Sequence, residues 1–160
     1  MVLAIGLLLG AALHDAAVRT IPNWIPTSLV AVGVILRMRD HSAVTGIWVA
    51  ALLLMVLGVF WLRGFIGGGD AKLIPAVALV LPPSDVPNFI LSVAIGGGAL
   101  ALLYVVLSRL VARPAPGRHR GFFARVLKTE AWRVHRRGPI PYAVAIAGGG
   151  VPIMIKTLAG

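Results

Sequence analysis

Two long apolar segments without charge limit what this chain can fold into. Residues 43–62 and 86–108 contain no Asp, Glu, Lys or Arg, and each is long enough for an α-helix to cross about 30 Å of hydrocarbon. Hydrophobic residues make up 59% of the 160 residues and charged residues only 12%, whereas soluble domains are roughly one quarter charged. The sequence therefore predicts an integral membrane protein, and its length allows one compact domain.

Four further apolar stretches predict an all-α, polytopic protein with a bundle of six transmembrane helices. The short stretches need tilt, local thinning of the bilayer or shelter by neighbouring helices. The first stretch is interpreted as a retained helix and not a signal peptide, because no basic segment precedes it. Glycine triplets inside the fifth and sixth stretches are expected to serve helix packing. The six stretches are 1–18, 24–36, 43–62, 71–81, 86–108 and 139–155.

The distribution of basic residues predicts the orientation of these helices. If the first helix enters from outside, the cytoplasmic connections are 19–23, 63–72 and 109–138. They carry twelve of the 15 Lys and Arg residues, in agreement with the positive-inside rule. Asp15 and Asp70 are then expected at the cytoplasmic ends of two helices, on the same membrane face.

Residue types that the chain lacks exclude several kinds of chemistry. There is no cysteine, which excludes disulfides, thiolate catalysis and cysteine-rich zinc sites. The four histidines (14, 41, 119 and 135) do not have the spacing of metal ligands. A divalent cation at the two acids would need more oxygen ligands than two carboxylates supply. No metal and no cofactor is therefore expected.

The two acids allow a structural and a chemical interpretation. Asp15 could pair with Arg19 one helical turn later, and Asp70 could be the N-cap of an apolar helix. His14 is expected to serve packing or the interface. Acids at membrane depth are rare, however, and usually functional. Two carboxylates held close together share a proton, so that one can accept a proton from water while the other donates to a scissile carbonyl oxygen.

The residues around both acids resemble one family. "DAAVRTIPNW" at 15–24 and "GGGDAKL" at 67–73 resemble the type IV prepilin peptidases, which are membrane aspartic proteases of the GxGD kind. In that family an Asp precedes an Ile-Pro-Asn turn, and a second Asp follows Gly-x-Gly, often with a Lys two positions later. "GPIPYAVAIAGG" at 138–149 is similar to the closing helix of the small members. The motif residues are Asp15, Ile21, Pro22, Asn23, Gly67, Gly69, Asp70 and Lys72.

The resemblance implies one prepilin peptidase domain over residues 1–160 with a GxGD aspartic protease core. It implies that Asp15 and Asp70 are catalytic and that no metal takes part. It also implies that prepilins are cut between a basic leader and an apolar helix, at the cytoplasmic face of the bacterial inner membrane. No methyltransferase region is expected, as in the short CpaA- or TadV-like enzymes of tight-adherence (Flp-type) pili. The supporting residues are Pro22, Asn23, Gly67, Gly69 and Lys72.

The basic segment 109–138 departs from a minimal core of six helices. Phe123, Val126, Leu127 and Val134 recur at helical spacing between cations, which predicts an interfacial helix on anionic lipids and disfavours a nucleic-acid partner. Two alternatives to a peptidase stay open. They are a small proton-coupled transporter that uses the acids as relays, and a non-catalytic pilus assembly factor.

Overall fold

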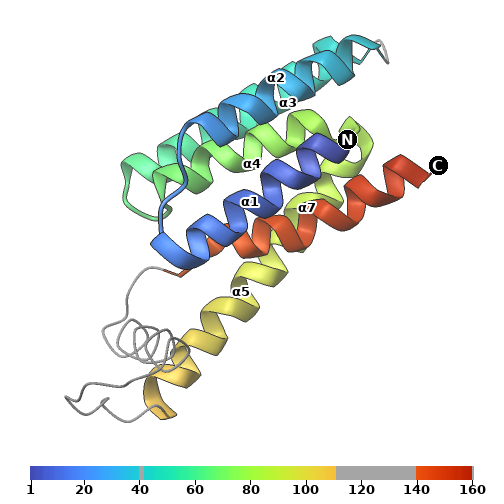
Figure 1. The fold of residues 1–160 in the computed structure, drawn as a ribbon. Helices are drawn as coiled ribbons and strands as arrows, with labels where there is room; N and C mark the ends of the chain where they lie inside the picture. The colour runs from blue at the N-terminus through green and yellow to red at the C-terminus, as the bar shows by residue number, and fades with distance from the viewer. Residues whose placement is uncertain (40–41, 111–139, 160) are drawn as a thin grey trace. The chain divides into compact units, whose positions relative to one another are not determined.

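The computed structural model describes residues 1–39, 42–110 and 140–159, and these residues are almost entirely helical (Figure 1). Three of the helices are long and apolar enough to cross a membrane, and α1 is a shorter apolar helix. The predicted all-α membrane fold is therefore confirmed. The elements are α1 (Val2–Val18), α2 (Trp24–Arg39), α3 (Ala43–Leu62), α4 (Gly68–Val80), the 3-10 turn η1 (Pro83–Asp85), α5 (Val86–Leu110) and α7 (Tyr142–Ala159).

The chain divides into two compact units, residues 1–97 with 141–160 and residues 98–140. The first unit contains α1 to α4, the first half of α5 and α7. The described part of the second unit is residues 98–110 of α5. Apart from its first two residues, the predicted basic loop with its interfacial helix lies outside the described residues.

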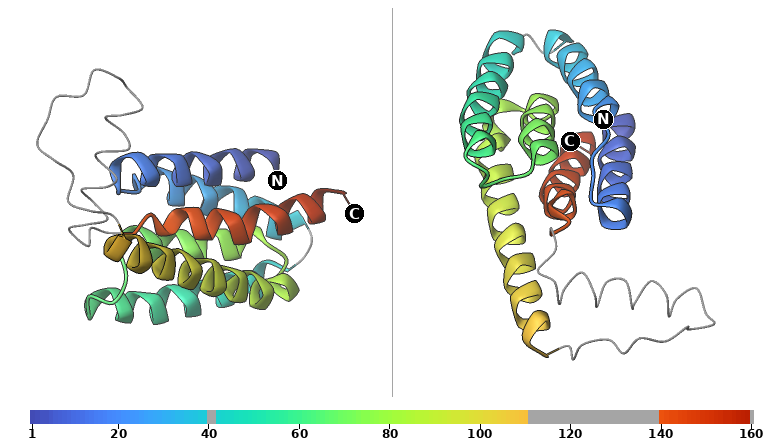
Figure 2. Two further views of the ribbon diagram at one scale, coloured as in Figure 1. Left: turned by 90° about the horizontal axis from the view of Figure 1, so that it is seen from below. Right: turned by 90° about the vertical axis from the view of Figure 1, so that its left-hand side faces the viewer.

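Helix α4 is the centre of the first unit. Both α2 and α3 pack extensively against it, α7 packs against another side of it, and α1 packs mainly against α7; Figure 2 shows α4 between α3 and α7. Every residue from Leu73 to Val80 is buried. This explains how a helix of 13 residues is accommodated in the bundle, since its neighbours shelter it from lipid.

Glycines allow the close approach of helices where the sequence led us to expect packing. A Cβ at Gly150 of α7 would lie 3.0 Å from the side chain of Leu8 and 3.2 Å from that of Val77. A Cβ at Gly149 would lie 3.1 Å from Val93. These two glycines therefore allow α7 to pack closely against α1, α4 and α5.

Helix α2 is longer than predicted because Arg37 is buried within the fold. Its guanidinium donates to Ser42 Oγ at 3.0 Å and to the carbonyl oxygen of Val80 at 3.4 Å. Val80 ends α4, so a cation lies at the negative end of that helix. The prediction that α2 ends at residue 36 was wrong, since α2 continues through Arg39.

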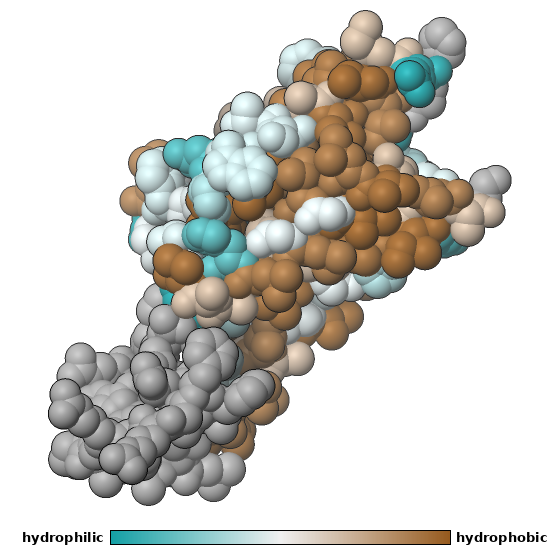
Figure 3. Space-filling view, viewed as in Figure 1, coloured by the Kyte–Doolittle hydropathy of each residue, from teal (hydrophilic) through white to brown (hydrophobic). Residues whose placement is uncertain are grey.

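The surface separates into apolar sides and a polar end. In Figure 3 hydrophobic residues cover most of the helical sides, while hydrophilic and neutral residues gather at the end where α1 finishes and α2 begins. Large exposed hydrophobic side chains are numerous on α3, among them Trp48, Leu52 and Met55. Such a surface suits lipid contact.

Candidate functional site

Asp15 lies in the last turn of α1 with its carboxylate inside the bundle. The residue is only 6% exposed. Its Oδ2 accepts a hydrogen bond of 3.1 Å from the backbone N–H of Ala143, in the first turn of α7. The first N–H groups of a helix have no partner within that helix, so Asp15 satisfies one of them from a different part of the chain.

The residues that flank Asp15 shape the turn between α1 and α2. Arg19 ends α1 in the left-handed conformation with φ 61°, and its N–H donates to the carbonyl oxygen of Asp15 at 2.8 Å. The charge of Arg19 also acts on the Asp15 carboxylate. His14 Nδ1 donates to the carbonyl oxygen of Thr20 at 2.7 Å, so His14 stabilises the connection to α2.

Asp70 lies in the first turn of α4, which begins at Gly68. The fourth apolar stretch was expected to begin at residue 71, so the helix starts three residues earlier than predicted and includes Asp70. Asp70 is not the N-cap, since Gly67 occupies that position. A Cβ at Gly67 would lie 2.9 Å from Asp70 Oδ2, so the absence of a side chain there leaves space for the carboxylate.

The two sequence motifs meet in the structure. A Cβ at Gly69 would lie 3.0 Å from Ile21 Cβ, which means that the start of α4 approaches the segment before α2 as closely as glycine permits. Lys72 Nζ donates to Asn23 Oδ1 at 3.1 Å. The glycines of the second motif thus allow contact with the first motif, and Lys72 and Asn23 join the two.

The two acids lie at the same end of the first unit. Asp15 is near the C-terminus of α1 and Asp70 at the N-terminus of α4, and the two carboxylates are close enough to interact electrostatically. Tyr142, the first residue of α7, is also within electrostatic range of Asp70. Its hydroxyl donates to the carbonyl oxygen of Val93 at 3.5 Å.

Sequence reasoning missed Tyr142 and the N–H of Ala143. The segment 138–149 was recognised only as a closing helix, and a backbone donor has no residue signature. A proline at position 141, just ahead of the helix start, is a typical signal for a helix N-terminus. From that signal one could have inferred that the first N–H groups of this helix are available to bond to an acid such as Asp15.

The arrangement supports proton transfer between two carboxylates and a bound molecule. Asp15 Oδ2 accepts from the N–H of Ala143, and a carboxyl group can accept such a bond in its ionised or its protonated form. Among the described residues, no group of three or more His, Cys, Asp or Glu side chains is placed to hold a metal ion. The described site therefore offers acid–base chemistry from two acids, with a tyrosine hydroxyl nearby.

Comparison with known proteins identifies the family. The model of the type IV leader peptidase family matches residues 2–102, which is more than half of the chain and includes both acids with their motifs. No curated protein and no solved structure matches. The chain therefore belongs to the type IV leader peptidase family, a family of membrane hydrolases that cut leader peptides.

Proposed function

We propose that this protein is an aspartic-type prepilin peptidase in which Asp15 and Asp70 together hydrolyse the peptide bond between leader and mature pilin. The observation that carries the proposal is the convergence of the two carboxylates at one end of the bundle. The bond from Ala143 N–H holds the Asp15 carboxylate in place. In this proposal, two acids from different helices would act on one peptide bond.

The proposed reaction needs one water molecule and one proton shared by the pair. The ionised carboxylate takes a proton from water as the water oxygen attacks the scissile carbonyl carbon, and the protonated carboxyl gives its proton to the carbonyl oxygen. The tetrahedral intermediate then collapses: one acid gives its proton to the leaving nitrogen as the carbon–nitrogen bond breaks, and the other carboxylate takes a proton from a hydroxyl group of the intermediate. The pair again holds one proton. The pair titrates as a unit, so the roles belong to the pair of acids.

The proposed substrates are prepilins with a short basic leader and an apolar helix, of the Flp type that the short members of the family serve. The site would face the cytoplasm of the bacterial inner membrane, which the charge distribution favours. The basic segment 109–138 would lie on anionic lipids at the same face. Pro22, Asn23, Gly67, Gly69 and Lys72 would position the two acids.

A proton-coupled transporter is the weaker proposal. It needs ionisable groups along a path through the membrane, whereas Asp15 lies three residues before the end of α1 and Asp70 in the first turn of α4. Both acids are thus near one end of their helices. A non-catalytic assembly factor would contain the same helices but would not require both acids.

Prepilin processing in membranes tests the proposal. We expect the wild-type protein to shorten a coexpressed prepilin, seen as a mobility shift and confirmed by sequencing the new N-terminus. Asp15→Asn and Asp70→Asn, at matched membrane levels, should each abolish the shift, while Asp85→Asn, at the far end of the bundle, should not. Cleavage by either of the first two variants at the wild-type rate would refute the paired-acid mechanism. Absence of cleavage by the wild-type protein would favour the assembly factor.

A further inference from the structure

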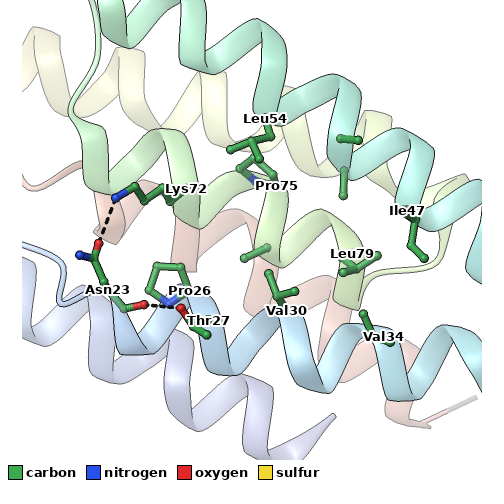
Figure 4. A pocket seen from close by; sticks show the side chains of 13 residues that line it. Asn23, Pro26, Thr27, Val30, Val34, Ile47, Leu54, Lys72, Pro75 and Leu79 are labelled. Atoms are coloured by element: carbon green, nitrogen blue, oxygen red, sulfur yellow. Dashed lines mark hydrogen bonds between the residues drawn. The ribbon is translucent and has the colours of Figure 1, made fainter.

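An apolar groove with a volume of about 660 Å³ opens between α2 and α3. Both helices pack against α4 but only slightly against each other, so α4 forms the floor of the groove (Figure 4). Aliphatic side chains, alanines and prolines line most of its length. The polar lining residues are Asn23, Thr27 and Lys72, and they lie together at one end.

The groove is separate from the acid pair. Its lining residues on α4 are Lys72, Pro75, Ala76 and Leu79, which follow the spacing of a single helix face. Asp70 precedes Lys72 by two positions, or about 200° around the helix axis. The groove and Asp70 therefore lie on opposite sides of α4, and a molecule in the groove would not approach the carboxylate through it.

The length of the groove matches one leaflet of a bilayer. Along α2 its lining extends from Asn23 to Val34, a rise of about 16 Å at 1.5 Å per residue. This is about half of the ~30 Å hydrocarbon core. An apolar helix that crosses the membrane would extend far beyond the groove, whereas an acyl chain from one leaflet would lie within it.

The polar end of the groove presents donors of hydrogen bonds and a positive charge. Lys72 is exposed, and its ammonium group has three donors, of which one bonds to Asn23 Oδ1. Because the amide oxygen of Asn23 accepts this bond, its amide nitrogen adds further donors. Basic pockets between membrane helices at the cytoplasmic side suit anionic headgroups.

We infer that the groove binds one anionic phospholipid, with an acyl chain along α2, α3 and α4 and the phosphate at Lys72 and Asn23. The lipid would bridge α2, which follows the first motif, and α4, which contains most of the second motif. This inference does not depend on peptidase activity, because its evidence is the shape and charge of a surface on the far side of α4.

Lipid binding to the purified, delipidated full-length protein tests the inference by native mass spectrometry. The probes are palmitoyl-oleoyl phosphatidylglycerol and phosphatidylcholine with the same chains. We expect one tightly held phosphatidylglycerol and a preference over phosphatidylcholine of about fivefold, the factor that one basic residue near an anionic surface supplies. Lys72→Gln should remove this preference. Equal retention of both lipids by the wild-type protein would overturn the inference.

A matched pair of variants on α3 isolates the groove from the basic segment 109–138, which is also predicted to bind anionic lipid. Ala51→Phe fills the groove, whereas Val56→Phe adds the same ring to an exposed position of α3 outside it. We expect Ala51→Phe to weaken retention of phosphatidylglycerol at least about fivefold and Val56→Phe to leave it unchanged. Ala50→Leu is the replacement if Ala51→Phe does not fold.

Further measurements distinguish a lipid from other occupants of the groove, and lipid binding from the proposed catalysis. Asp70→Asn should retain the lipid normally, so loss of cleavage without loss of lipid leaves the inference intact. Dodecyl phosphate should compete for the groove, and inorganic phosphate alone should not. If Ala51→Phe retains the lipid like the wild type but raises the KM for prepilin, the groove binds substrate and the inference is wrong.

Discussion

The side chain of Asp15 accepts a hydrogen bond from the backbone N–H of Ala143, 128 positions further along the chain. Both residues are buried, and the bond ties the end of α1 to the first turn of α7. Asp15 is therefore a structural residue as well as a candidate catalytic one. A loss of activity at this position can come from either role, so the two need separate measurements.

The first prediction separates these roles by comparing two substitutions of Asp15. Asp15→Asn keeps a side-chain oxygen that can accept from Ala143 N–H, whereas Asp15→Ala leaves a buried N–H without a partner. We expect the alanine variant to lose about 1–3 kcal/mol of stability, the usual cost of such a group, and the asparagine variant to lose little. Thermal unfolding in detergent measures the difference, and both variants should fail to cleave prepilin. Equal unfolding temperatures for Asp15→Ala and the wild type would show that the bond contributes nothing.

The second prediction concerns the contact between Gly69 and Ile21. A methyl group at Gly69 would lie 3.0 Å from Ile21 Cβ, so Gly69→Ala must displace the first turn of α4 or the segment before α2. Overpacking of this kind costs about 1–3 kcal/mol. Because Asp70 belongs to the displaced turn, we expect cleavage to fall at least about tenfold, given that a displacement near 1 Å can cost about 100-fold.

Gly58→Ala is the control for this substitution. It lies on α3, where no described atom is within 4 Å of the added methyl group, so it should be neutral or slightly stabilising. Ile21→Ala should partly restore the Gly69→Ala variant by removing the outer part of the facing side chain. If Gly69→Ala cleaves as fast as Gly58→Ala, the close approach has no bearing on the position of Asp70.

The helices could be predicted because long apolar segments without charge have few alternatives in a membrane protein. Residues 43–62 were predicted with the bounds that α3 has in the structure, and residues 24 and 86 were predicted as the starts of α2 and α5. The predicted end of α2 failed because it depends on a tertiary contact. Helix α2 extends because Arg37 bonds to the end of α4, and a basic residue after an apolar stretch gives no sign of such a partner.

For the candidate site, the two acids and the motif residues around them were predictable, but the backbone group that bonds to Asp15 was not. Counting charges placed Asp15 and Asp70 at the same membrane face, and the structure brings them within electrostatic range. Gly69 lies inside α4, and the absence of a side chain there lets the start of this helix approach Ile21. The N–H of Ala143 could not be predicted, because every residue except proline has one.

The third prediction concerns the hydrogen bond between Lys72 and Asn23, which joins the two motifs. Both side chains are exposed, so we expect Lys72→Ala and Asn23→Ala each to change stability by less than about 1 kcal/mol. If the bond positions the start of α4, the double variant should cleave prepilin no more slowly than the slower of the two single variants. A double-mutant cycle on kcat/KM measures this coupling. Fully additive losses would show that the two residues act independently.

The fourth prediction concerns Gly97 and Tyr142. A Cβ at Gly97 would overlap the ring of Tyr142, so Gly97→Ala forces that ring to move. Tyr142 adjoins Ala143, which holds Asp15, and lies within electrostatic range of Asp70. We therefore expect Gly97→Ala to reduce cleavage at least about tenfold through misplacement of the acids, at membrane levels close to those of the wild type.

Removal of the ring tests whether the overlap is the cause of that loss. In the background of Tyr142→Ala, the methyl group at Gly97 meets no ring, so the double variant should cleave at the rate of Tyr142→Ala alone. Gly148→Ala is the control within α7, because no described atom lies within 4 Å of its added methyl group, and it should cleave like the wild type. If Gly97→Ala lowers cleavage by the same factor with and without the tyrosine ring, its effect arises within α5, and Tyr142 has no part in positioning the acids.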